Sequence, residues 1–265
     1  MLSPPTALPD AFSNPASASR RSVRTNILGS ANVLESAVAA RVRSVVCLST
    51  DKAVMPINTM GMTKAVMEKV AQATARRLSE TDTHVCAVRY GNVMYSRGSV
   101  IPLFVNQIRR RQCLTITDPG MTRFMLPLTE AVELVEFAFE NCRQGDVFVR
   151  KAPACTVGDL ARALCELFDV ECETKVIGIR HGEKIYETLA TSEELFRAED
   201  MGGYFRIPMD TRDLNYAVYY TDGETAKASV QDYHSHNATQ LNVPQVKDLL
   251  RSLPEIQQAL RESPR

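Results

Sequence analysis

After a leading segment without periodicity, apolar residues recur at the spacings of helices and strands in turn. Residues 26–42 carry apolar positions every three or four residues, which predicts a helix with one buried face. Residues 44–49 (SVVCLS) form a short continuous apolar run, typical of a parallel strand covered on both faces. A second helical pattern covers 58–78, and a second buried-strand pattern covers 84–90. Strand, helix and strand in this order predict a parallel β–α–β unit.

Shorter elements follow and complete the predicted α/β fold class. We expect helices over 100–111, 129–141, 156–168 and 243–262, and extended segments at 113–117, 121–126, 146–149 and 174–178. In an α/β protein of this kind, ligand chemistry is expected at the carboxyl ends of the parallel strands.

Residues 1–23 are predicted to be a disordered leader. The first 20 residues hold four Pro, four Ser and four Ala and show no helical or strand period. Such a segment buries too little apolar surface to offset its ordering entropy. It lacks the apolar core of a signal peptide. A wrongly placed start and an Arg/Ser-rich transit peptide stay open as alternative interpretations.

Charge balance and cysteine content restrict the partners and the location. The 265 residues include 31 Lys+Arg and 31 Asp+Glu, so the formal net charge is zero. Nucleic acids and anionic membranes usually require a basic excess, and no run approaches the roughly 18 apolar residues of a membrane span, so neither partner is expected. The seven cysteines contain no C-x-x-C pair, which indicates reduced thiols in a cytoplasmic protein. His234 and His236 lack Cys or acidic neighbours at ligand spacing, so no metal site is expected.

Polar residues directly follow both of the predicted parallel strands. The first strand ends in S-T-D-K (49–52) and the second in Y-G-N (90–92). Because the carboxyl ends of neighbouring parallel strands meet at one edge of a sheet, we expect these residues to lie close together.

The segment from Ser49 to Lys64 (STDKAVMPINTMGMTK) carries most of the functional information. Met60 lies four residues before Lys64 on the predicted helix, so the two side chains share a helical face. The segment resembles short-chain dehydrogenases/reductases, in which Ser/Thr at a strand end is followed by Tyr-x-x-x-Lys, with Met60 at the tyrosine position. The full string resembles an extended branch, the CapD/CapE-like polysaccharide biosynthesis proteins. It looks closest to inverting UDP-N-acetylglucosamine 4,6-dehydratases.

Other segments extend the resemblance from residue 24 to about residue 253. They are N-I-L-G-S (26–30), R-Y-G-N-V (89–93), S-R-G-S-V-I-P-L-F (96–104), L-T-I-T-D-P (114–119), M-T-R-F (121–124), R-H-G-E-K (180–184) and D-T-R-D-L-N-Y (210–216). The resemblance implies the carboxyl-terminal part of an NAD(P)-binding Rossmann fold over 24–95. It further implies a smaller α/β nucleotide-sugar lobe over 96–265, some of whose segments return to the Rossmann sheet, and a homo-oligomer in full-length members.

The sequence contains no glycine-rich turn of the form G-x-G-x-x-G, which holds the dinucleotide pyrophosphate in this family. No two of the twelve glycines are separated by a single residue. We therefore expect the chain to be the carboxyl-terminal part of the enzyme. By itself it is not expected to retain the implied cofactor, NADP (or NAD). The strand at 44–49 is expected to have an unpaired edge.

The resemblance also implies roles for individual residues. Lys52 is implied as the base for the C5 proton and Asp51 as the acid for the C6 hydroxyl. Thr50 is implied to hold the 4-hydroxyl, and Lys64 the nicotinamide ribose. The implied cofactor-binding residues are Thr50, Lys64 and Tyr90. The implied substrate-binding residues are Asn92, Arg97, Ser99, Val100, Thr115, Thr117, Arg123, Arg180 and Glu183.

Loss of water from C6 of a hexose requires an acidic proton at C5, and oxidation of C4 to a ketone provides that acidity. The predicted function is therefore a UDP-N-acetylglucosamine 4,6-dehydratase that also epimerises C5, in capsule or O-antigen synthesis, present as a truncated chain. A UDP-hexose 4-epimerase of the same family is an alternative, although such enzymes normally use the tyrosine missing here. The other alternative is a non-catalytic remnant that binds a nucleotide sugar at most.

Overall fold

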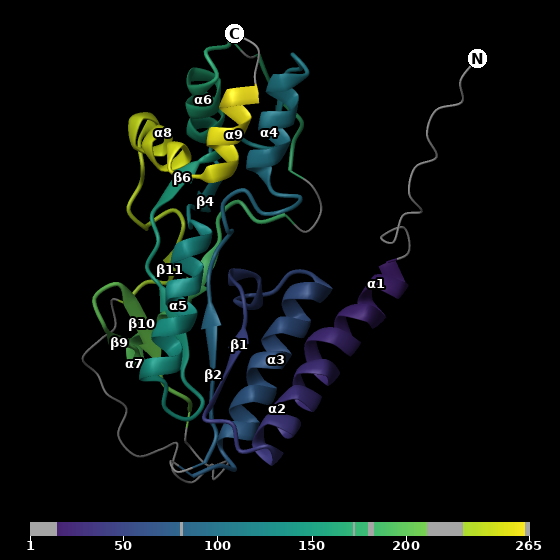
Figure 1. The fold of residues 1–265 in the computed structure, drawn as a ribbon, viewed down its shortest axis with the longest axis vertical. Coiled ribbons are helices and arrows are strands. Elements are labelled where there is room, and N and C mark those ends of the chain that lie inside the picture. Colours follow the sequence, from purple (N-terminus) through teal and green to yellow (C-terminus); the bar gives the residue numbers. More distant parts are fainter. Residues whose placement is uncertain (1–14, 80–81, 172, 180–182, 211–229, 263–265) are drawn as a thin grey trace.

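A computed structural model describes residues 15–79, 82–171, 173–179, 183–210 and 230–262. Its first feature is one long helical segment beside α3 (Thr59–Ala75), as Figure 1 shows. This segment consists of α1 (Pro15–Ser22), the π-helix η1 (Val23–Gly29) and α2 (Ser30–Ala39). Residues 15–23, predicted as part of a disordered leader, are thus helical, because a helix that is already nucleated extends at little cost. The remaining leader residues, 1–14, lie outside the described residues.

A five-stranded sheet forms the centre of the fold, in the order β1-β2-β5-β10-β9. Its strands are β1 (Ser44–Leu48), β2 (His84–Arg89), β5 (Val147–Arg150), β10 (Tyr204–Ile207) and β9 (Glu199–Asp200). β1, β2 and β5 run parallel, with Ser44 opposite His84 and Leu48 opposite Val88. β10 pairs antiparallel with both β5 and β9. The predicted α/β class with a parallel β–α–β unit is confirmed, and β1 lies at the edge of the sheet.

Helices cover both faces of this sheet. The side chains of β2 alternate between two cores: Val85 packs with Leu34 and Met67 from α2 and α3, whereas Val88 packs with Leu134 from α5 (Leu128–Asn141). All five of these apolar side chains are at most 2% exposed. Burial on both faces explains why the strand sequence is continuously apolar. In Figure 1, α3 and α5 accordingly lie on opposite sides of β1 and β2.

A second group of elements, which we call the small lobe, packs around a core of its own at the other end of the molecule (Figure 1). It consists of α4 (Val100–Arg109), β3 (Leu114–Ile116), β4 (Thr122–Phe124), β6 (Ala154–Thr156), α6 (Val157–Leu167), β7 (Thr174–Val176), α8 (Val243–Arg251) and α9 (Pro254–Glu262). Its centre contains Phe104, Leu114, Leu160 and Leu250, each 1% exposed or less. The division at residue 95 stays a prediction.

Three short elements connect the sheet and the small lobe. They are β8 (Thr188–Ala190), α7 (Ser192–Arg197) and β11 (Tyr233–His234). β8 and β11 pair antiparallel. Across the described ranges, no helix is long and apolar enough to cross a membrane, and the six described cysteines are free thiols.

Candidate active site

The turn that follows β1 brings two charged side chains to the carboxyl end of the sheet. After β1 the chain forms the single 3-10 turn η2 (Asp51–Ala53). Thr50 caps this turn, since its Oγ1 accepts a hydrogen bond from the backbone N–H of Lys52 at 3.4 Å. The N–H of Asp51 donates to the carbonyl oxygen of Tyr90 at 3.2 Å. This bond joins the ends of β1 and β2, so the two strand ends are neighbours as predicted.

Asp51, Lys52 and Asn92 form one hydrogen-bonded group. The Asp51 side chain is 1% exposed, and Lys52 Nζ lies 3.1 Å from its Oδ1 and 3.2 Å from its Oδ2. Thr50 Oγ1 donates to Asp51 Oδ1 at 2.6 Å. Lys52 Nζ also donates to Asn92 Oδ1 at 3.0 Å. Asp51 is therefore a buried carboxylate with both oxygens hydrogen-bonded, and Lys52 is held between Asp51 and Asn92.

A second buried carboxyl group, that of Glu187, completes this arrangement. Glu187 Oε1 accepts a hydrogen bond from Asn92 Nδ2 at 2.9 Å and lies 4.0 Å from Lys52 Nζ. Arg123 Nε is 3.5 Å from the same oxygen. Burial, and after it the charge of Asp51, raises the pKa of Glu187 to about 7.

These side chains line a cavity of about 210 Å³. Asn58, the cap of α3, together with Glu183 and Lys184 completes its polar lining. Lys184 Nζ donates to the carbonyl oxygen of Val54 at 2.6 Å, and burial lowers the pKa of Lys184. Carboxyl, amine and amide groups thus converge on a space that suits a ligand rich in hydroxyl groups.

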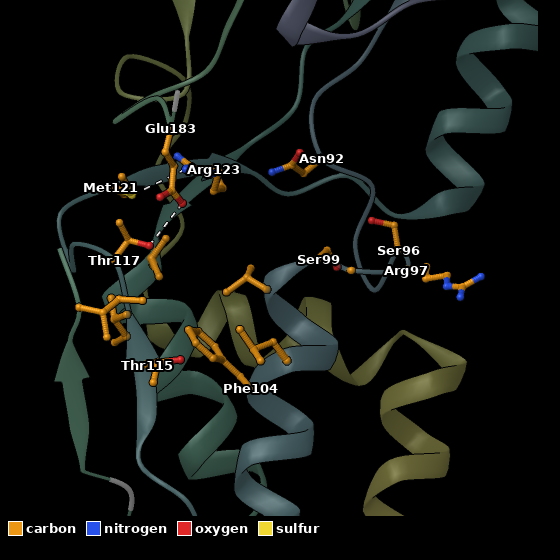
Figure 2. Close-up of a pocket in the computed structure, with 16 residues that line it drawn as sticks. Asn92, Ser96, Arg97, Ser99, Phe104, Thr115, Thr117, Met121, Arg123 and Glu183 are labelled. Carbon is orange, nitrogen blue, oxygen red and sulfur yellow. Dashed lines mark hydrogen bonds between the residues drawn. The ribbon is translucent and has the colours of Figure 1, made fainter. Parts of the chain in front are cut away.

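A larger cavity of about 410 Å³ adjoins the first one, since Asn92, Arg123 and Glu183 line both. Figure 2 shows Arg123 and Glu183 at one end of it, and Ser99 and Arg97 at the start of α4. Ser99 Oγ is buried and has no hydrogen-bond partner among the residues that the structure describes. It lies beside the first backbone N–H groups of α4, which have no partner within the helix. A helix start with a free hydroxyl is suited to bind an anionic oxygen.

Thr115 of β3 and Thr117, which directly follows this strand, form the wall opposite this helix start. Thr117 Oγ1 donates to Glu183 Oε1 at 3.3 Å, and Thr115 Oγ1 accepts a hydrogen bond from Gln107 Nε2 at 2.8 Å. Eight of the predicted substrate-binding residues line this one cavity: Asn92, Arg97, Ser99, Val100, Thr115, Thr117, Arg123 and Glu183. Arg180, also predicted, lies outside the described residues.

The predicted cofactor residues Lys64 and Tyr90 lie elsewhere. Lys64 lines a separate cavity of about 410 Å³ between α2 and β1, where its Nζ donates to the carbonyl oxygen of Leu48 at 2.8 Å. Burial lowers the pKa of Lys64. The half-buried ring of Tyr90 packs against the cores of the sheet, and burial raises its pKa. Met60 is 38% exposed and does not contribute to any of these three cavities.

Comparison with known proteins gives the family. Residues 13–209 match the polysaccharide biosynthesis protein family, and residues 210–257 match its C-terminal region. The chain belongs to the polysaccharide biosynthesis protein family. Its relatives include proteins named UDP-glucose 4-epimerase from Rickettsia felis and Rickettsia akari. They are 55% and 54% identical over 241 residues, which are 91% of this chain and 71% of the relatives.

Solved structures agree with this family assignment. The X-ray structure of Pen from Bacillus thuringiensis is 34% identical, with a TM-score of 0.75 over 87% of this chain and 69% of that chain. The dTDP-glucose 4,6-dehydratase DesIV from Streptomyces venezuelae, solved with NAD, shares the fold with a TM-score of 0.57 at 20% identity, over 64% of this chain and 58% of DesIV. The predicted family and Rossmann-type fold are confirmed.

The rickettsial relatives carry the name of a nucleotide-sugar enzyme, and this name agrees better with the 4-epimerase alternative than with the predicted UDP-N-acetylglucosamine dehydratase. They do not distinguish NAD from NADP. Capsule or O-antigen synthesis, cytoplasmic location and a homo-oligomer stay predictions, as do the roles of the site residues.

Two features of this polysaccharide biosynthesis protein are absent from the sequence-based prediction. One is the pair Lys184 and Glu187: Lys184 ends the R-H-G-E-K segment, to which no role is assigned at this position, and the signal for Glu187 is a polar residue directly before the apolar run of β8. The other is a buried ion network below the site. Arg89 makes two hydrogen bonds to Glu68, at 2.8 and 2.6 Å, and two to Glu194, at 2.7 and 2.8 Å. Ser49 Oγ donates to Glu68 at 2.5 Å and connects this network to the end of β1.

The family implies a nicotinamide dinucleotide, and the residues present fit one end of it. Lys64 offers a partly buried ammonium group in an open cavity at the carboxyl end of β1, which suits a ribose diol. The pyrophosphate end requires a glycine-rich turn between a strand and a helix. No such turn occurs in the described ranges of the chain.

Proposed function

We propose that this protein acts on UDP-hexoses and that its reaction is 4-epimerisation, the inversion of the hydroxyl group at C4. The observation that carries the proposal is the amine of Lys52 at the end of β1, held by Asp51 and Asn92 beside a cavity with a helix N-terminus in its wall. The names of the rickettsial relatives support this reaction over others of the family.

The larger cavity is proposed to hold the UDP group. Its diphosphate would lie against the start of α4, where Ser99 Oγ and the N–H of Val100 are available and where Arg97 can approach from the surface. The uridine would lie between the Thr115–Thr117 wall and Glu183. This placement directs the hexose through the shared lining of Asn92 and Arg123 into the smaller cavity.

The smaller cavity is proposed to hold the reacting carbon. A bound NAD or NADP supplies the acceptor for the hydride that leaves C4. Thr50 holds the 4-hydroxyl group, and Lys52 exchanges its proton while Asp51 and Asn92 fix the amine. Lys64 holds the ribose of the dinucleotide. Met60 cannot take over the proton transfer, because a thioether has no exchangeable proton.

A second candidate, 4,6-dehydration with exchange at C5, is favoured by one observation. Asp51 and Lys52 place an acid and a base 3.1 Å apart, and elimination of water across C5 and C6 uses both groups. Epimerisation at C4 requires only one of them.

The test is NMR of the chain with UDP-glucose or UDP-N-acetylglucosamine in D₂O, with NAD or NADP added. The proposed reaction yields the C4 epimer without deuterium at C5. A 4-keto-6-deoxy product with deuterium at C5 supports the second candidate instead. Absence of both products with either dinucleotide contradicts the proposed activity of this chain.

Two variants separate binding from chemistry. Lys52→Ala is expected to abolish both C4 inversion and C5 exchange while UDP still binds, as measured by calorimetry. Ser99→Ala is expected to weaken UDP binding several-fold, since one hydrogen bond contributes about 1 kcal/mol. If C4 inversion, or C5 exchange for the second candidate, survives in Lys52→Ala at an unchanged rate, Lys52 is not the base.

A further inference from the structure

Glu187 has an unusual environment for a carboxyl group. Its side chain is 5% exposed, and its Oε2 has no hydrogen-bond partner of normal geometry among the described residues. A buried carboxylate oxygen without a donor is costly when it carries charge, whereas a protonated carboxyl group is tolerated. This oxygen therefore suggests a group that gains and loses a proton.

The charged groups that act on Glu187 come from three segments packed around it. Asp51 and Lys52 lie on η2, Arg123 on β4, and Lys184 in the segment before β8. Lys52 Nζ stands between the two carboxyl groups, 3.1 Å from Asp51 and 4.0 Å from Glu187. Asp51 has hydrogen bonds to both oxygens. Where two carboxyl groups share a site, the one with fewer donors holds the proton, which here is Glu187.

We propose that Glu187 holds the proton that Lys52 exchanges with the sugar, and so replaces the phenol that Met60 does not provide. Glu187 acts through Lys52 and is a positioning residue, not one that touches the sugar. The inference rests on the proposed function, because it assigns Lys52 to the 4-hydroxyl group.

The proton transfer balances as follows. The ammonium group of Lys52 gives a proton to the Glu187 carboxylate and takes the proton of the 4-hydroxyl as that O–H bond breaks. The C4–H bond breaks with its electron pair, which passes to the nicotinamide dinucleotide, and C4 becomes a ketone. The ammonium group is unchanged overall, and Glu187 is now a neutral acid. Both transfers reverse when hydride returns to C4.

A rotation of the lysine side chain would close the 4.0 Å between Lys52 Nζ and Glu187 Oε1. Catalytic hydrogen bonds in empty sites are often long and shorten when the substrate binds. Burial raises the pKa of Glu187 to about 7, the range in which a proton carrier works at neutral pH; the charge of Asp51 adds to this, and Lys52, Arg123 and the backbone of Phe124 oppose it.

The first experiment needs no turnover. Infrared difference spectra of the wild type against Glu187→Gln are expected to show the C=O stretch of a neutral carboxyl group that disappears between about pH 6 and 8. Asp146, whose pKa burial also raises, is present in both proteins and cancels. Glu193→Gln, which removes an exposed carboxylate, is the matched control and should leave the band in place. In Lys52→Met, the pH at which this carboxyl band is half gone should rise by about one unit, because Glu187 loses a neighbouring cation.

The second experiment is the pH profile of kcat/KM for C4 inversion. The wild type is expected to gain activity as pH rises through about 7, since the carboxylate form accepts the proton. Glu187→Gln should no longer show this rise in activity with pH, and its rate should fall about 100-fold. Glu187→Asp should still show the rise. If kcat/KM falls equally at every pH in both variants and the rise in activity near pH 7 is unchanged, Glu187 is only structural.

The two experiments separate the two claims. A band that titrates and responds to Lys52→Met, without turnover on any UDP-hexose, refutes the proposed function and leaves the coupling of Glu187 to Lys52 intact. Absence of a titrating band, or the same band in Glu187→Gln, overturns the inference whatever the activity.

Discussion

A Cβ atom on Gly61 would lie 2.1 Å from the carbonyl oxygen of Lys52. The first turn of α3 therefore rests directly on the turn that carries the proposed base. Asn58 fixes the start of this helix, as its Oδ1 accepts a hydrogen bond from the N–H of Gly61 at 2.9 Å. Position 61 thus controls where the backbone of Lys52 can lie.

Gly61→Ala is expected to be destabilising, although alanine is favoured over glycine in a helix by about 1 kcal/mol. The contact is with backbone, which cannot rotate away, so overpacking at about 1–3 kcal/mol outweighs the helix preference. Urea unfolding measures the change. Gly203→Ala, where the new Cβ has nothing within 4 Å, is the control and should stay within about 0.5 kcal/mol of the wild type.

Arg89→Met is expected to cost about 3–5 kcal/mol of stability, because it leaves Glu68 and Glu194 without their shared cation. The double variant Arg89→Met/Glu68→Gln should recover part of this loss, since the more deeply buried carboxylate is then neutral. Denaturant unfolding of the wild type and both variants measures these differences in the free energy of unfolding. Equal stability of the single variant and the wild type would show that the network contributes nothing.

Glu187 makes folding stability depend on pH. Its pKa is about 7 in the folded protein, against an ordinary value of 4.5 for a glutamate side chain, so the folded state holds up to one more proton between these limits. The free energy of unfolding therefore falls as pH rises through this window, by at most about 1.4 kcal/mol per pH unit for this group. Glu187→Gln should lack this contribution. Parallel pH dependences of the two proteins would contradict the assigned shift.

Met60→Tyr is expected to change turnover by less than about tenfold, since the proposed chemistry proceeds without a phenol at this position. The side chain at position 60 is 38% exposed on α3 and can accept a tyrosine without repacking a core. Steady-state kinetics with each UDP-hexose provides the measurement. A gain of about 100-fold or more would instead identify position 60 as a lost catalytic site and support the remnant interpretation.

The purified chain is expected to carry no bound dinucleotide, because the described residues offer a ribose contact at Lys64 and no pyrophosphate site. Turnover should therefore depend on the concentration of added NAD or NADP. Mass spectrometry of the denatured protein checks for retained cofactor. A stoichiometric dinucleotide would refute this expectation, and Lys64→Met should then reduce its amount.

The parts of the site that sequence predicts are those fixed by local order along the chain. Asp51, Lys52 and Asn92 directly follow two buried strands, and parallel pairing brings such residues together. Arg123 is predicted only through the family resemblance, and Glu187 is not predicted, because it reaches the site through tertiary packing that no local pattern records. The helical residues 15–23 escaped prediction for a different reason: they continue η1 and α2, and their order depends on that continuity.

The carboxylate of Glu194, at the start of α7, accepts hydrogen bonds from two different parts of the chain. Its Oε2 accepts the backbone N–H of Thr191 in the capping box of this helix, and the same carboxylate binds Arg89 of the central sheet. The short helix therefore cannot fray without exposing a buried guanidinium group. Its amide protons are expected to exchange with solvent only in openings that also release the end of β2, so the two elements behave as one cooperative unit.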